Sequence, residues 1–297
     1  MQRYVAWGAN GGDSDMGKNG LKIGTCSWNY KSWVGIVYSE QQNRAADYLP
    51  EYAKRFDTAE IDSTFYGIPK REWMQEYADK VPDGFRWTLK VPQQITLTHE
   101  RGSRPLKANP TFMSNEVFDE FLEAIEPILS NTDSIMFEYE YLNRQKIGSL
   151  EEFLDPLDRF FTKAPGDFPY GIEPRNRDFL TDTYFDFLNS HGLHHVFSHK
   201  EYMTPVWNVY QRHKEKIEQA DRTVIRLLGE NRKAIEKKAG GRWDKILEPK
   251  DHELGKIVGM VASMVSKMYT ILNVNTHYEG ASPLTVAKIQ NLYKQLL

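Results

Sequence analysis

Residues Arg86–Pro92 read RWTLKVP, and the character of their side chains alternates from one position to the next. Trp87, Leu89 and Val91 fall on one side of this alternation, and Lys90 falls on the other. Because successive side chains of a β-strand point to opposite faces, the pattern predicts a strand with one apolar face. A charge inside a folded protein is costly unless it is paired or used. If helices cover the apolar face, Lys90 points into a space that the strands enclose.

Other strand-like segments also place charges on one side only. Thr58–Phe65 carries Glu60 and Asp62 there, Tyr170–Arg175 carries Glu173 and Arg175, Thr223–Gly229 carries Arg226, and Ser134–Glu140 contributes Glu138. With Lys90 they make four acids and three bases. This near balance permits a mutually paired network, and it equally permits a polar ligand held by both signs of charge. For Glu60, nearer the start of its strand, we favour a structural ion pair.

Strand-like and helix-like segments alternate eight times along the chain. The predicted strands are Leu21–Trp28, Thr58–Phe65, Arg86–Pro92, Ser134–Glu140, Tyr170–Arg175, His194–Lys200, Thr223–Gly229 and Tyr269–Asn275. The predicted helices are Gln42–Phe56, Lys70–Lys80, Asn115–Leu129, Ser149–Thr162, Thr181–His191, Val206–Ala220, Asp251–Lys267 and Leu284–Leu296.

Eight such units predict a parallel sheet covered by helices, and eight is the number that closes a TIM (β/α)₈ barrel. An open, doubly wound sheet is the alternative, but the chain shows no glycine-rich nucleotide fingerprint. We therefore expect one barrel domain over residues 21–297, preceded by a flexible lead-in over residues 1–20. Active sites of such barrels lie at the carboxyl ends of the strands, where most of the inward charges fall.

Composition narrows the class of protein. The 297 residues carry a net charge of −3, which argues against a bulk electrostatic grip on nucleic acid. The single cysteine, Cys26, excludes an intrachain disulfide and any cysteine-rich metal motif. No apolar run is long enough for a membrane helix, and no signal-peptide core is present. We expect a cytoplasmic protein with no membrane partner; the sequence indicates neither an oligomeric state nor a cofactor.

The charged residues suggest distinct chemical roles. Arg175 can hold a carboxylate or phosphate through two parallel hydrogen bonds. Glu173 is the candidate general acid or base, with Asp62 or Glu138 as its partner. Lys90 either binds an anion, which we favour, or acts as a base or Schiff-base nucleophile if burial lowers its pKa.

Residues in the connecting loops complete the candidate site. Asn275 and His277 follow the last strand and are expected to orient a ligand, although a plain polar turn is equally compatible. Trp28 and Tyr66 could stack on a sugar or a base, or only plug the barrel. The histidines lack metal-ligand spacing, so we expect no bound transition metal. Two long connections, Gln93–Ser114 and Glu230–Lys250, would lie over the site as lids or surface insertions.

Several blocks resemble a known family. They are GTCSWNYKSWVG (Gly24–Gly35), FDTAEIDSTFYGIP (Phe56–Pro69), PDGFRWTLKVPQQIT (Pro82–Thr96), IEPRN (Ile172–Asn176), IRLLG (Ile225–Gly229) and NTHYEGASP (Asn275–Pro283). In this order they are similar to the blocks of the domain of unknown function 72 family, the YecE-like proteins. The resemblance implies a TIM barrel and no established activity.

The chain departs from that family's pattern near the expected site. Asp62 stands where asparagine is usual, and Glu138 opens a Glu-Tyr-Glu block where Gln-Phe-Pro is usual. Leu228 and Thr276 replace a histidine and an asparagine. The resemblance therefore implies a more acidic site in this chain, which favours a metal or a cationic ligand slightly more than in the family.

These features favour an enzyme that acts on a small polar or anionic ligand, such as a sugar or phosphorylated metabolite, at the carboxyl ends of the strands. Lys90, Arg175 and Arg226 would bind negative charge. One alternative is a protein that binds nucleic acid or cleaves phosphodiesters with a metal. The other is a non-catalytic module that senses a metabolite.

Overall fold

All eight predicted strands pair in parallel and in chain order, and β1 also pairs with β8, so that the sheet closes. The strands are β1 Leu21–Cys26, β2 Thr58–Ile61, β3 Arg86–Lys90, β4 Thr132–Glu138, β5 Tyr170–Glu173, β6 His194–Lys200, β7 Arg222–Gly229 and β8 Tyr269–Val274. The predicted TIM barrel is confirmed, and the open sheet is excluded. This computed structural model describes residues 20–297, so most of the predicted lead-in, residues 1–19, lies outside the described residues.

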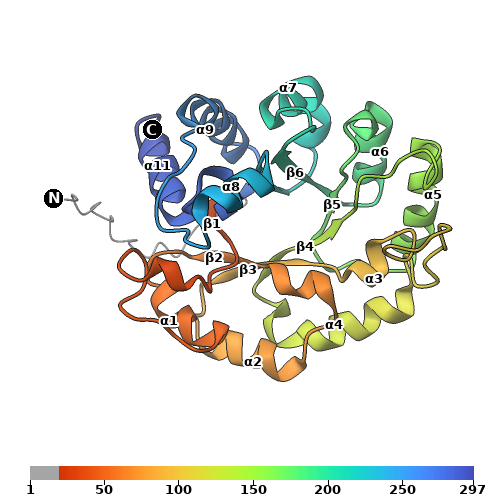
Figure 1. Ribbon diagram of the computed structural model, residues 1–297. Coiled ribbons are helices and arrows are strands. Elements are labelled where there is room, and N and C mark those ends of the chain that lie inside the picture. The colour runs from red at the N-terminus through yellow and green to blue at the C-terminus, as the bar shows by residue number, and fades with distance from the viewer. Residues whose placement is uncertain (1–19) are drawn as a thin grey trace.

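Helices surround the barrel (Figure 1). They are α1 Leu49–Tyr52, α2 Arg71–Asp79, α3 Gln93–Thr96, α4 Asn115–Leu129, α5 Leu150–Phe161, α6 Asp182–Ser190, α7 Val206–Ile217, α8 Arg232–Ala239, α9 Asp251–Val265, α10 Thr276–Glu279 and α11 Ser282–Lys294. Short 3₁₀ turns are η1 Lys31–Trp33, η2 Ala45–Tyr48, η3 Asp62–Tyr66 and η4 Arg177–Phe179. Within residues 20–297, every helix falls short of the length and apolar character needed to cross a membrane.

Local sequence explains where the helices begin. The Ser149 hydroxyl accepts a hydrogen bond from the Glu152 amide at 3.2 Å, which caps α5. The Glu152 carboxylate accepts in turn from the Gly148 amide at 2.7 Å. These bonds satisfy amides that a helix otherwise leaves unpaired. From α5, Phe153, Leu157 and Phe160 are fully buried in the layer between helices and strands.

The barrel interior is stratified. An apolar layer of Met136, Val196, Val224 and Ile271, one residue each from β4, β6, β7 and β8, fills its middle. Beyond this layer, toward the carboxyl ends of the strands, charged inward residues gather together with a few polar ones such as Asn273. The interior is thus packed and not an open pore, as in other such barrels, and the charged layer rests on an apolar floor.

Some predicted boundaries were wrong. The helix expected over Gln42–Phe56 is only the short η2–α1 segment, because Arg44 is extended and the Tyr48 hydroxyl bonds the backbone of Gln42. The strand expected to reach Trp28 ends at Cys26, where Ser27 adopts a left-handed φ of 68°.

The two long connections contain helices that were not predicted. Gln93–Ser114 opens with α3, and Glu230–Lys250 contains α8. In Figure 1, α8 lies nearer the barrel axis than α9 and α11 do. The second connection therefore reaches over the carboxyl ends of the strands.

Candidate functional site

Arg226 on β7 is the centre of the charged layer. Its Nε and Nη2 atoms donate to Glu60 at 2.8 and 2.6 Å, and its Nη1 donates to Glu173 at 2.6 Å and to Glu138 at 2.8 Å. The side chain is fully buried, and it joins β7 to β2, β4 and β5 across the barrel. Burial and ion pairing of this kind fix geometry, because each charge depends on the others for its solvation. Glu60 thus forms the structural ion pair that its position predicted.

Lys90 and Arg175 extend the same network. The Lys90 amine lies 2.5 Å from Asp62 and 2.9 Å from Glu138. Nη2 of Arg175 lies 3.0 Å from Glu138 and 2.8 Å from Glu173. All seven charges predicted to face inward therefore meet in one ion-pair network. The predicted strand ends were wrong for two of them: β2 ends at Ile61 and β5 at Glu173, so Asp62 lies in η3 and Arg175 beyond β5. We call this network the mouth cluster; it comprises Glu60, Asp62, Lys90, Glu138, Glu173, Arg175 and Arg226.

Two neighbouring carboxyl groups of the mouth cluster have pKa values displaced in opposite directions. Burial raises the pKa of Glu138, but Arg175, Lys90 and Arg226 outweigh it and hold that pKa well below its usual value. Burial also raises the pKa of Glu173, and there it prevails over the lowering effect of Arg175 and Arg226. Opposed shifts in adjacent carboxyls are typical of sites where protons are exchanged.

Lys90 remains a cation. Desolvation and Arg226 lower its pKa, but Glu138 and Asp62 raise it further, so that the pKa lies above its ordinary value. A Schiff-base or general-base lysine needs the opposite shift. The structure therefore supports the electrostatic role that we favoured for Lys90 over the nucleophilic one.

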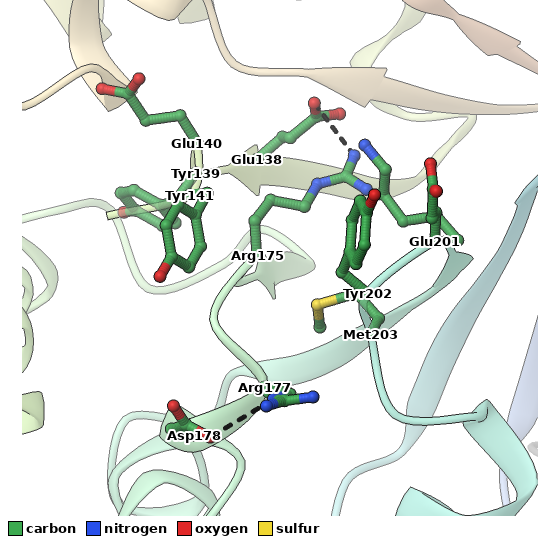
Figure 2. Close-up of a pocket in the computed structure, with 11 residues that line it drawn as sticks. Glu138, Tyr139, Glu140, Tyr141, Arg175, Arg177, Asp178, Glu201, Tyr202 and Met203 are labelled. Carbon is green, nitrogen blue, oxygen red and sulfur yellow. Dashed lines mark ion pairs between the residues drawn. The ribbon is translucent and has the colours of Figure 1, made fainter. Parts of the chain in front are cut away.

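A pocket of about 670 Å³ adjoins the mouth cluster (Figure 2). It is formed at the ends of three consecutive strands, β4, β5 and β6, and is lined by Glu138, Tyr139, Glu140, Tyr141, Arg175, Arg177, Asp178, Lys200, Glu201, Tyr202 and Met203. Its volume falls in the range of small-molecule sites, about 300–1,000 Å³. The pocket is therefore the place where the cluster can meet a ligand.

Arg175 is the link between the cluster and the pocket. Its side chain is only 10% exposed, and its Nη1 atom has no hydrogen-bond partner among residues 20–297. Figure 2 shows the guanidinium reaching toward Glu138 in the pocket. A buried, unpaired donor is costly, and this nitrogen is a hydrogen-bond donor that the mouth cluster leaves unused.

Lys200 at the end of β6 was missed by sequence reasoning, because a register shift between His199 and Lys200 interrupts the alternation there. It lines the pocket. Desolvation and the neighbouring Arg175 lower the pKa of its amine. Tyr141 and Tyr202 were also missed, because each stands just beyond a strand, where alternation no longer predicts direction.

The remaining predicted ligand-binding residues lie elsewhere. Asn275 caps α10 and bonds His277, whose Nε2 lies 3.1 Å from Glu236 of α8. These two residues hold α8 in place and do not line the pocket described above. Tyr66 in η3 is exposed and is also outside that pocket.

Trp28 is not part of the mouth. Its side chain is 3% exposed and packs edge-on against Tyr77 and beside Trp87, while its indole nitrogen donates to the Ala45 carbonyl at 2.8 Å. The left-handed turn at Ser27 directs it into the helix–strand layer. It packs in the core between helices and strands, so neither role considered for it, stacking on a ligand or plugging the barrel, applies.

A cysteine thiol and a metal ion are two further groups that could take part in catalysis. Cys26 is buried, and desolvation together with Glu60 raises the pKa of its thiol, so it is a poor nucleophile. Within residues 20–297, no group of three or more His, Cys, Asp or Glu side chains is arranged to hold a metal ion. Whether the protein binds a metal stays a prediction, to be tested by elemental analysis.

Comparison with known proteins gives a family and a fold. Residues 22–296 match the model of the family described as "Protein of unknown function DUF72". The UPF0759 protein YecE of Escherichia coli is 25% identical over 175 residues, which are 59% of this chain and 55% of that protein. The match thus spans about half the length of this curated relative.

Two solved structures share the fold. A DUF72 family protein of Thermotoga maritima has a TM-score of 0.68 at 17% identity, covering 92% of this chain and 99% of the other. Another from Enterococcus faecalis has a TM-score of 0.65 at 17% identity, covering 92% and 95%. At this identity the likeness concerns architecture only.

Proposed function

Since this chain belongs to the DUF72 family, whose description names no activity, we propose a function from its own pocket: it is an enzyme that binds a small anionic ligand at the barrel mouth and removes a proton from it. The observation that carries this proposal is the buried Nη1 atom of Arg175, which has no partner among residues 20–297 and belongs to a side chain that lines the pocket.

Arg175 and Lys200 supply the positive charge for the anion. The guanidinium can donate in parallel to two oxygens of a carboxylate or phosphate. Lys200 lines the same pocket and adds a second cation. The acidic side chains of the pocket keep its net charge low. Specificity for an anion therefore depends on the positions of the hydrogen-bond donors more than on the net charge of the pocket.

Of the neighbouring carboxylates Glu138 and Glu173 in the mouth cluster, Glu138 is the one that faces the ligand, because it lines the pocket and Glu173 does not. In the free protein Arg175 is the strongest single charge that keeps the pKa of Glu138 low. An anion that engages Arg175 offsets this charge, and the pKa of Glu138 rises. Ligand binding would thus convert Glu138 into a competent base, while Glu173 positions Arg175.

The first test is binding. Inorganic phosphate and a series of small phosphorylated and carboxylated compounds are titrated calorimetrically against the wild type and Arg175→Lys. We expect the substitution to weaken binding by about 10- to 100-fold, the equivalent of about 1–3 kcal/mol, because lysine lacks the planar pair of donors. The melting temperature should change little.

Arg177→Lys is the matched control, since Arg177 lines the same pocket but its side chain is 67% exposed beside Asp178. We expect its loss of affinity to be several-fold smaller. If the melting temperature fell sharply in Arg175→Lys while ligand affinity held, Arg175 would be a structural ion-pair residue and the proposal would be wrong.

The second test is turnover. Glu138→Gln should retain binding of the anion and lose the activity found for any compound that the wild type converts. A ligand that binds with Arg175 dependence but is never converted would instead favour a non-catalytic sensing module. That candidate has one specific observation in its favour: Glu138 and Glu173 are both already ion-paired. A steep loss of affinity with salt for DNA or RNA would favour the nucleic-acid alternative.

A further inference from the structure

Two exposed tyrosines stand on either side of the buried arginine. Tyr141 follows β4, Arg175 follows β5 and Tyr202 follows β6, and these three strands are neighbours in the sheet. Both rings line the pocket, and Figure 2 shows them flanking Arg175. Their exposed fractions, 67% for Tyr141 and 82% for Tyr202, are far above those of the core tyrosines. Large aromatic surface left in water at a pocket wall is typical of a binding surface.

The backbone at Tyr202 is held in an unusual conformation. Its φ is 68°, in the left-handed region that side chains with a Cβ rarely adopt. Such conformations persist where surrounding structure imposes them, and they cluster at ligand-binding positions. The neighbouring Glu201 carboxylate raises the pKa of Tyr202. The left-handed backbone sets the direction in which the side chain leaves the chain.

We propose that the pocket binds a sugar that bears an anionic group, with the sugar ring between Tyr141 and Tyr202 and the anion on the guanidinium of Arg175. This inference rests on the proposed function, which supplies the anion site. It adds that the rest of the ligand is a sugar ring. A flat or chair-like ring packs its faces against aromatic side chains, and an acyclic ligand of the same charge does not.

The polar walls favour a sugar over a heteroaromatic base. The half-buried carboxylates of Glu140 and Glu201 line the pocket beside the two rings. Ionised carboxylates only accept hydrogen bonds, so they suit the several hydroxyl donors of a sugar. The acceptor nitrogens and carbonyls of most bases would face like partial charges there.

The test compares four probes by calorimetry: glucose 6-phosphate, glycerol 3-phosphate, adenosine monophosphate and inorganic phosphate. In the wild type, glucose 6-phosphate should bind at least tenfold more tightly than glycerol 3-phosphate. Tyr202→Ala and Tyr141→Ala should each remove most of this advantage and leave the affinity for inorganic phosphate within about twofold. Tyr202→Phe should keep most of it, because the ring remains. Trp73→Ala, in an exposed aromatic residue of α2 outside the pocket, should change nothing.

The outcomes separate the two proposals. Equal affinity for the cyclic and acyclic phosphates, with Arg175-dependent binding of both, would overturn the sugar clamp and leave the anion site standing. Tighter binding of adenosine monophosphate than of glucose 6-phosphate would overturn the sugar and assign a nucleotide. Absence of Arg175-dependent binding for all four probes would overturn both.

Discussion

Arg175 and Arg226 are the two inward arginines of the mouth cluster, yet their surroundings give them different roles. Arg226 donates four hydrogen bonds to three carboxylates and is closed to a ligand. Arg175 keeps one donor nitrogen without a partner among residues 20–297. Strand alternation predicted that both would face inward. It did not predict which one would remain free, because that depends on distances between strands that are far apart in sequence.

Among single residues, the side chains that line the pocket beyond the strand ends could not be identified from strand alternation. Tyr202 depends on a left-handed backbone turn, and Tyr141 follows the end of β4. Lys200 follows a register shift between His199 and Lys200, where alternation no longer sets the direction of a side chain. In the same strand, His194 and His195 are buried, and desolvation lowers their pKa values to about 3.

The displaced pKa values predict an acid sensitivity that depends on Glu138. Its pKa is depressed in the folded protein, so its carboxylate stabilises the fold above the ordinary value of 4.5 and this stability is lost as pH falls toward the folded pKa. We expect Glu138→Gln to be about 1–3 kcal/mol less stable at pH 7 and to lose less further stability below pH 4.5. Urea denaturation from pH 7 downward measures both.

Glu72→Gln, on the exposed face of α2, is the control and should follow the wild-type curve. A Glu138→Gln variant whose stability fell with acid as steeply as the wild type would show that other carboxyls account for the acid response.

Among the elements, α8 shows what a sequence pattern can predict about a helix and what it cannot. The segment was predicted as part of a long connection, but its signals were present: Asn231 caps the helix, Ile235 and Ala239 are buried four residues apart, and Gly240 ends it in a left-handed conformation. Such start and stop signals are readable in sequence. The contact that holds α8, between Glu236 and His277, was not readable, because the two residues are 41 positions apart in sequence.

The turn that leads to α8 depends on Gly229. Its φ is +79°, and a Cβ there would lie 2.2 Å from the His277 carbonyl oxygen. Gly240 also has a positive φ, +55°, but a Cβ there would meet nothing within 4 Å. We expect Gly240→Ala to cost about 1–2 kcal/mol from the left-handed backbone alone. Gly229→Ala should cost about 1–3 kcal/mol more, because the overlap forces the backbone to shift.

Chemical denaturation of both variants gives this difference, and fluorescence of Trp243, which contacts His277, follows the turn itself. Equal losses in the two variants would mean that the β7–α8 turn yields freely, and α8 would then not be fixed over the mouth.

At the scale of the whole molecule, the count of strand–helix units was sufficient to predict the barrel. Eight units with apolar outer faces close in only a few ways, and the pairing of β1 with β8 confirms closure. The sequence could not predict that the seven inward charges would share one network, since alternation sets direction but not height along the barrel axis. Their common height follows from the register of the strands, such as Glu138 opposite Glu173.

That network ties distant parts of the barrel together, and this leads to a prediction for the fold as a whole. Arg226→Met would leave Glu60, Glu138 and Glu173 buried around an uncharged side chain. Removing one partner of a buried ion pair costs about 3–5 kcal/mol, and here three carboxylates lose their common partner. We expect a loss at the upper end of this range at pH 7, measured by urea denaturation. Arg159→Met is the control, because Arg159 and its partner Asp155 on α5 are both exposed; exposed pairs contribute about 0–1 kcal/mol. The loss in Arg226→Met should shrink as pH is lowered, since protonated carboxyls no longer need a counter-charge. A variant as stable as wild type at pH 7 would mean that water solvates these carboxylates, and the barrel mouth would then be open where the structure has it closed.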